Sequence, residues 1–126
     1  KMEYLYGLRI TFEEPIYNVE TANGAISGLL EVFKFKYVCK WIWLIPELHG
    51  DPSRLNYRGT HYHGFMMIHD QRGFTQFLKK LPKWVSFHFF KCQNEIQYLK
   101  YCLKEYSETE ASHKSYIKYV VKKESE

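Results

Sequence analysis

The feature that most constrains the fold is the alternation of side chains in residues 4–12. Every second position in this segment carries a large apolar side chain, namely Tyr4, Tyr6, Leu8, Ile10 and Phe12. A strand that is buried on one face has this period of two. Residues 39–47 and 84–91 are rich in aromatic and β-branched side chains, which favour strands, and residues 60–69 are a further segment of this kind. The chain is therefore expected to build a sheet.

The segments between these strands have helical or loop character. Apolar side chains recur at helical spacing over about residues 21–37, 73–80 and 94–106, and residues 116–121 fit a last short strand. Residues 50–59 are loop-like, which predicts that the strands on either side pair as an antiparallel hairpin with a long loop. We therefore expect an α+β fold in which helices flank a central antiparallel sheet of about five strands.

Composition limits the class of protein further. With 126 residues, 45% of them hydrophobic and 25% charged, the chain has the balance of one globular domain spanning residues 1–126. The net charge of +4 permits a polyanionic partner, and the excess of Lys and Arg lies after residue 70. The cysteines lack a CxxC spacing, which argues against a disulfide framework, and no apolar run is long enough to cross a bilayer. These features predict a soluble, intracellular protein with no membrane partner.

Two histidines one residue apart form the first candidate site. His61 and His63 lie in an expected strand, so both imidazoles point to one face and Tyr62 points to the other. The expected hairpin brings Glu47 nearest to them, and a hard or borderline divalent cation favours such a carboxylate. A His-His-Glu set leaves coordination positions open, which suits a catalytic metal. The alternative is that the two histidines only form hydrogen bonds at a sheet edge.

A tyrosine on the helix expected over residues 94–106 is the second candidate. The apolar seam of this helix consists of Ile96, Leu99 and Leu103. At about 100° per residue, Tyr101 points away from that seam, with Lys104 beside it. A neighbouring cation lowers the pKa of a phenol, so Tyr101 is a candidate nucleophile, and Tyr98 on a similar flank is a rival. The alternative is an exposed amphipathic helix with a chance Tyr-Lys pair.

Three short motifs follow one another along the chain. They are E-L-H at 47–49, T-H-Y-H-G-F at 60–65 and Y-C-L-K at 101–104. Together they resemble the single-tyrosine HUH endonucleases, specifically the nuclease domain of the replication initiators (Rep) of rolling-circle viruses and plasmids. Residues 10–15 resemble the upstream motif of this family. The resemblance implies the HUH/Rep fold, an RRM-like or ferredoxin-like sheet that carries the metal and lies under the tyrosine helix.

The activity implied by this resemblance is metal-dependent, sequence-specific nicking and joining of single-stranded DNA at a replication origin, which initiates rolling-circle-type replication. Tyr101 would form a 5′-phosphotyrosine intermediate with help from Lys104. The metal, Mg²⁺ or Mn²⁺, would be held by Glu47, His61 and His63 and would polarise the phosphate. The host cytoplasm or nucleus would be the place of action.

Two further expectations concern the loop and the domain content. The loop at residues 50–59 carries Arg54, Tyr57 and Arg58, which we expect to reach DNA by phosphate attraction and base stacking. A merely solvated loop is the alternative. No G-x-x-x-x-G-K-[ST] motif occurs, so no helicase domain is expected in this chain.

Other functions fit the same residues. A single-tyrosine HUH transposase uses the same chemistry and typically acts as a homodimer that exchanges the tyrosine helix. A non-catalytic module for single-stranded nucleic acid would stack bases on aromatic side chains, which make up 18% of the chain. A small zinc-stabilised interaction domain is disfavoured, because no cysteine is placed near the histidines at a familiar spacing.

Overall fold

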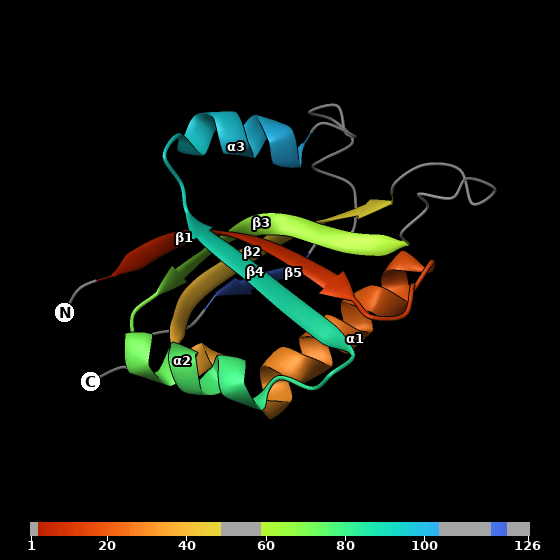
Figure 1. Cartoon of the computed structure of the whole chain (residues 1–126), viewed down its shortest axis with the longest axis horizontal. Helices are drawn as coiled ribbons and strands as arrows, with labels where there is room; N and C mark the ends of the chain where they lie inside the picture. The colour runs from red at the N-terminus through yellow and green to blue at the C-terminus, as the bar shows by residue number, and fades with distance from the viewer. Residues whose placement is uncertain (1–2, 49–58, 104–116, 121–126) are drawn as a thin grey trace.

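The structure, a computed structural model, describes residues 3–48, 59–103 and 117–120. Its strands are β1 (Tyr4–Phe12), β2 (Cys39–Leu48), β3 (Thr60–Ile68), β4 (Val85–Lys91) and β5 (Ile117–Val120). Its helices are α1 (Val19–Val32), α2 (Gln71–Lys80) and α3 (Glu95–Cys102), with a 3₁₀ turn, η1, at Phe35–Tyr37. None of these helices has the length and apolar character needed to cross a membrane. The fold is α+β with an antiparallel sheet flanked by helices, which confirms this part of the prediction (Figure 1).

The strands lie in the order β4-β1-β3-β2-β5, and each neighbouring pair is antiparallel. The predicted hairpin is confirmed, because β2 and β3 pair from Cys39 opposite Ile68 to Leu48 opposite Thr60. On its other side, β3 pairs with β1, which in turn pairs with β4. The strand that carries the two histidines therefore lies in the middle of the sheet, supported by a neighbour on each side.

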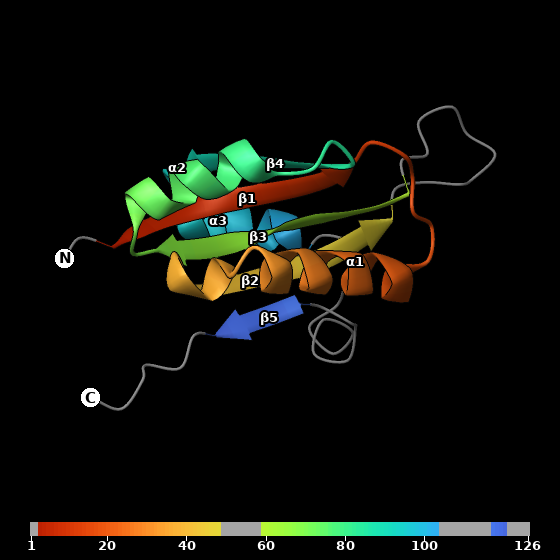
Figure 2. The same ribbon diagram turned by 90° about the horizontal axis from the view of Figure 1, so that it is seen from below.

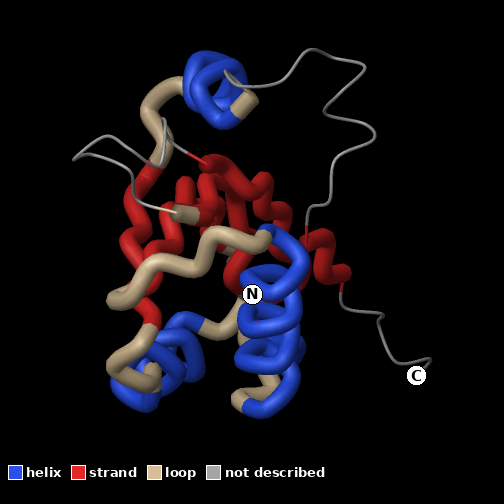
Figure 3. The backbone as a smooth tube through the Cα atoms, turned by 90° about the vertical axis from the view of Figure 1, so that its right-hand side faces the viewer, coloured by secondary structure: helices blue, strands red, loops and turns tan. Residues whose placement is uncertain are grey.

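Helices lie on both faces of the sheet. α1 and α2 pack on one face, and α3 lies over the other (Figure 1, Figure 3). Figure 2 shows α1 and α2 in front of the strands and α3 behind them. The hydrophobic core fills the layer between the sheet and the first two helices, and its buried side chains include Leu8, Ile10, Ile26, Leu30, Ile42, Leu44, Tyr62, Met66 and Phe74. Burial of this apolar surface is the main force that drives folding.

The helix predicted for residues 21–37 is shorter than expected. α1 is capped at its start by Asn18, and it ends before the predicted last turn. Lys34 then adopts a left-handed conformation with a φ of 52°, and the 3₁₀ turn follows. This break turns Phe35 into the core, where its ring centroid lies 4.6 Å from that of Phe77 on α2. A continuous helix would have left Phe35 off the apolar stripe, so burial of this ring outweighs the lost helical turn.

Candidate functional site

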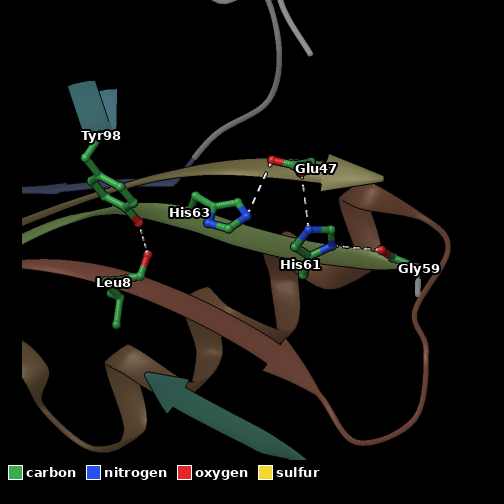
Figure 4. A network of polar contacts seen from close by, with 6 residues as sticks. All are labelled: Leu8, Glu47, Gly59, His61, His63 and Tyr98. Atoms are coloured by element: carbon green, nitrogen blue, oxygen red, sulfur yellow. Dashed lines mark hydrogen bonds and ion pairs between the residues drawn. The ribbon is translucent and has the colours of Figure 1, made fainter. Parts of the chain in front are cut away.

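The paired strands β2 and β3 bring the predicted metal ligands together. Glu47 lies directly opposite His61, and His63 lies two residues further along β3 on the same face. Glu47 Oε1 is 3.5 Å from His61 Nε2, and Glu47 Oε2 is 3.6 Å from His63 Nε2 (Figure 4). The three side chains are buried, with exposed fractions of 1% for the glutamate and 5% and 4% for the histidines. The structure thus assembles the group that period two and hairpin pairing predicted.

A backbone hydrogen bond orients His61. Its Nδ1 lies 3.2 Å from the carbonyl oxygen of Gly59. In the neutral ring with its proton on Nδ1, this bond is donated to Gly59 and the lone pair of Nε2 is directed at the Glu47 carboxylate. Two lone-pair-bearing atoms that face each other in this way suit a cation between them. A hydrogen bond to the second ring nitrogen is also typical of a metal-bound histidine.

The spacing of the ligand atoms fits a single metal ion. The three ligand atoms all lie within 4.8 Å of one another. Ligands bound about 2.1 Å from one ion at a roughly tetrahedral angle are about 3.4 Å apart, which is close to the separation of Glu47 from each imidazole. The Glu47, His61 and His63 group can therefore hold a metal ion. Three protein ligands leave coordination positions open for water or a substrate.

The helix α3 places Tyr101 beside this metal-binding group. The rings of Tyr101 and His63 lie edge to face, with centroids 5.1 Å apart and an interplanar angle of 85°. Tyr101 keeps an exposed fraction of 48%, so a large substrate can reach it from solvent. A phenol, two imidazoles and a carboxylate thus meet on the face of the sheet that α3 covers.

The predicted apolar seam of α3 is wrong. Ile96 and Leu99 have exposed fractions of 69% and 40%, whereas Cys102 is fully buried and Tyr98 is half-buried. The helix therefore turns its Tyr98 and Cys102 side toward the sheet. The physical reason is that the sheet surface under α3 is itself aromatic, and a tyrosine ring makes a larger and more specific contact with such a surface than an aliphatic side chain.

Tyr98, the rival candidate nucleophile, faces β1 instead of the metal-binding group. Its hydroxyl donates a hydrogen bond to the carbonyl oxygen of Leu8 at 2.8 Å (Figure 4). Burial raises the pKa of Tyr98 well above its ordinary value, and the neighbouring Cys102 thiol adds to this effect. A phenol whose proton is engaged in this way is a poor nucleophile, so the geometry favours Tyr101.

Four residues that were predicted to act at the site are not among the described ones. Arg54, Tyr57 and Arg58 from the loop, and Lys104 after α3, all lie outside the described residues. His49 of the E-L-H motif lies outside them as well. The predicted roles of Arg54, Tyr57, Arg58 and Lys104 therefore stay predictions.

Arg9 is a basic residue beside the site that the sequence did not single out. It lies opposite His63 on β3 and opposite His88 on β4, on the same face of the sheet as the metal-binding group. Its side chain is half-buried and forms no ion pair with any residue that the structure describes. In the alternating segment 4–12, Arg9 occupies a position between the large apolar side chains, which places it on the face away from the core. This points to the candidate site only when β1 is known to pair with β3.

We compared the chain with known proteins and found no relative. No protein-family model, no curated protein and no solved structure matches the chain. The candidate site is therefore defined by where this structure places Glu47, His61, His63 and Tyr101.

Proposed function

We propose that this protein is a single-tyrosine HUH endonuclease of the replication-initiator (Rep) type. The observation that carries the proposal is the position of Tyr101, whose ring lies against His63 beside the metal-binding group. The order of the motifs along the chain supports it independently. The residues that carry those motifs, Glu47, His61, His63 and Tyr101, are the ones that meet in space.

In the proposed reaction, the phenol oxygen of Tyr101 attacks the phosphorus of a phosphodiester in single-stranded DNA. A bond forms between that oxygen and phosphorus, and the bond from phosphorus to the 3′ oxygen of the preceding nucleotide breaks. The phenol gives up its proton and the departing 3′ oxygen takes one up, so the products are a 5′-phosphotyrosine and a free 3′-hydroxyl. Attack of a 3′-hydroxyl on the phosphotyrosine reverses these steps and joins strands.

Each residue has a defined task in this scheme. A divalent ion, Mg²⁺ or Mn²⁺, bound by Glu47, His61 and His63 would neutralise charge on the phosphate oxygens in the transition state. The attachment of Tyr101 to a helix held on the sheet avoids much of the entropy loss of bringing nucleophile and phosphate together. Lys104 would supply a cation that assists the phenol or the charge of the transition state.

The surroundings of the site suit a DNA strand. Arg9 lies opposite His63 on the same face of the sheet, and an arginine without an acidic partner among the described residues is suited to bind a phosphate. Arg54, Tyr57 and Arg58 would add contacts to phosphates and bases. The proposed partner is single-stranded DNA at a replication origin, where nicking and joining initiate rolling-circle-type replication.

A covalent-adduct assay tests the proposal. The protein is incubated with Mn²⁺ or Mg²⁺ and a random-sequence pool of single-stranded oligonucleotides labelled at either the 3′ or the 5′ end. We expect the 3′ label to stay with the denatured protein and the 5′ label to leave on the fragment with the free 3′-hydroxyl. Tyr101→Phe should form no adduct but still bind DNA. Chelation of the metal should abolish the adduct more than it weakens binding, because Lys and Arg contact phosphates without a metal.

The same assay separates the competing functions. An adduct that persists in Tyr101→Phe and is lost in Tyr98→Phe would move the nucleophile to Tyr98. Binding of single-stranded DNA without any adduct from the wild-type protein would identify a non-catalytic module. A mixture of the Tyr101→Phe and His63→Ala variants would recover an adduct if two chains exchanged α3, as in a transposase dimer. We expect no recovery, because Tyr101 lies beside the His63 of its own chain.

A further inference from the structure

One side chain of α3 makes a set of contacts that joins the helix to three strands. The Tyr98 hydroxyl donates its hydrogen bond to Leu8 on β1 at 2.8 Å. The Tyr98 ring lies edge to face with Phe65 on β3 and with Phe90 on β4, at centroid distances of 5.1 and 5.0 Å. Cys102, one turn further along the helix, is fully buried. Tyr98 therefore attaches α3 to β1, β3 and β4.

A glycine on β1 makes room for this attachment. Gly7 lies opposite Phe65 on β3 and opposite Phe90 on β4. A Cβ added at Gly7 would lie 2.5 Å from atoms of the Phe90 ring and 2.9 Å from Cys92 Sγ, well inside van der Waals contact. The missing side chain lets the Phe90 ring lean over β1, where it meets Tyr98.

Tyr98 also contacts Tyr101. The two residues are neighbours on one side of the helix, and their rings stack with centroids 6.2 Å apart and an interplanar angle of 20°. The Tyr101 ring in turn lies 5.1 Å from that of His63. A helix of 8 residues has little stability of its own, so its place on the sheet depends on tertiary contacts of this kind.

We infer that Tyr98 is the positioning residue for the nucleophile: its hydroxyl bond to β1 and its ring contacts hold α3 so that Tyr101 stays beside His63. This inference rests on the proposed function, in which Tyr101 reacts with the phosphate. Tyr98 itself makes and breaks no bond in the reaction. Its hydroxyl acts by keeping its proton in the hydrogen bond to the Leu8 carbonyl oxygen.

The variant Tyr98→Phe tests the inference, because it removes the hydroxyl and keeps the ring. The matched control is Tyr6→Phe, which removes a β1 hydroxyl that accepts a hydrogen bond from Gln71 Nε2 on the opposite face of the sheet. Three quantities are measured for each: amide hydrogen exchange across residues 99–103, the rate of adduct formation at saturating DNA and metal, and DNA affinity with the metal chelated.

For Tyr98→Phe we expect amide exchange in α3 to be about tenfold faster and adduct formation at saturating DNA to be about tenfold slower, as the loss of one hydrogen bond predicts. DNA affinity should not change, because the inferred role of Tyr98 is to hold α3 and not to contact DNA. Tyr6→Phe should leave α3 exchange and the adduct rate at their wild-type values. This combination separates a positioning role from a general loss of stability, which would affect both variants.

Every other combination contradicts the inference. If amide hydrogen exchange in α3 of Tyr98→Phe is as slow as in the wild-type protein, the Tyr98 hydroxyl does not attach α3 to the sheet. Faster exchange with an unchanged adduct rate would overturn the positioning role, and a loss of DNA affinity in place of a slower saturated rate would assign Tyr98 to substrate binding. If the wild-type protein forms no adduct, the proposed function fails together with the positioning role, while amide exchange still decides whether Tyr98 attaches α3.

Discussion

Three consecutive residues of β3 have different roles because their side chains alternate between the two faces of the sheet. His61 and His63 point toward Glu47, whereas Tyr62 between them is fully buried in the core. The Tyr62 hydroxyl donates a hydrogen bond to Asn23 Oδ1 on α1 at 2.6 Å. The middle residue therefore fixes β3 against α1, and this support holds the two imidazoles in place for a metal.

Arg9 gives a prediction about a single charge. Arg9→Gln removes the positive charge of the residue opposite His63 and keeps a polar side chain. Each phosphate contact contributes about 0.7 to the slope of log affinity against log salt concentration for single-stranded DNA. We therefore expect Arg9→Gln to bind more weakly and to lower the magnitude of this slope by about 0.7. Fluorescence anisotropy over a salt series, with the metal chelated, measures both quantities.

A control variant with the same charge change is available on the other side of the molecule. Arg72 is exposed on α2, which covers the opposite face of the sheet. Arg72→Gln should leave the salt slope unchanged. A wild-type slope in Arg9→Gln, or an equal reduction in both variants, would remove Arg9 from the proposed DNA contact.

Among the elements, the β2–β3 pair is the one on which the metal-binding group depends. Gly64 directly follows His63 and lies opposite Leu44 of β2. A Cβ at this position would overlap the carbonyl oxygen of Trp43. This close approach explains why a glycine stands in the middle of a strand, where it otherwise weakens the structure.

We predict that Gly64→Ala lowers the free energy of unfolding by about 3 kcal/mol, because β2 must move away from β3 to admit the methyl group. The same movement separates Glu47 from the histidines, so metal affinity should fall as well. Urea denaturation and isothermal titration with Mn²⁺ measure the two effects. A variant with wild-type stability and metal affinity would show that the strands do not approach so closely.

Gly28→Ala provides the comparison for this change. Gly28 is exposed on α1, and an added Cβ meets no atom within 4 Å. Alanine is the better helix former, so this variant should gain about 0.5–1 kcal/mol in the free energy of unfolding. If Gly64→Ala lowers the free energy of unfolding and Gly28→Ala raises it, the loss of stability at Gly64 comes from the close contact of the strands. It does not come from replacing glycine with alanine as such.

For the whole molecule, a bound metal would couple the site to global stability, because the ligands come from two core strands. An ion that binds only the folded protein, at 100 times its Kd, stabilises it by about 2.7 kcal/mol. For a domain of this size, that corresponds to a rise in Tm of roughly 10 °C. We therefore expect Mn²⁺ to raise the Tm measured by circular dichroism, and Glu47→Gln, which keeps the shape of the side chain, to abolish the rise. If Mn²⁺ raises the Tm of Glu47→Gln as much as that of the wild-type protein, the ion binds at a site other than Glu47, His61 and His63.

The sequence by itself determined the features that depend on local periodicity. Alternation along β1 and β3 assigned side chains to faces, and this placed His61 and His63 together. The loop between β2 and β3 implied a hairpin, which brought Glu47 to the same point. These features are predictable because neighbouring side chains of a strand must point to opposite faces, and strands joined by a loop tend to pair.

Only the tertiary structure decided which elements lie against each other across longer separations. The aromatic surface of Phe65 and Phe90 turned α3 so that Tyr98 faces the sheet and Ile96 faces solvent, against the apolar pattern. The pairing of β1 with both β3 and β4 brought Arg9 beside His63. Such choices depend on the packing of the whole core, because α3 carries large apolar or aromatic side chains on more than one side and its own periodicity cannot select among them.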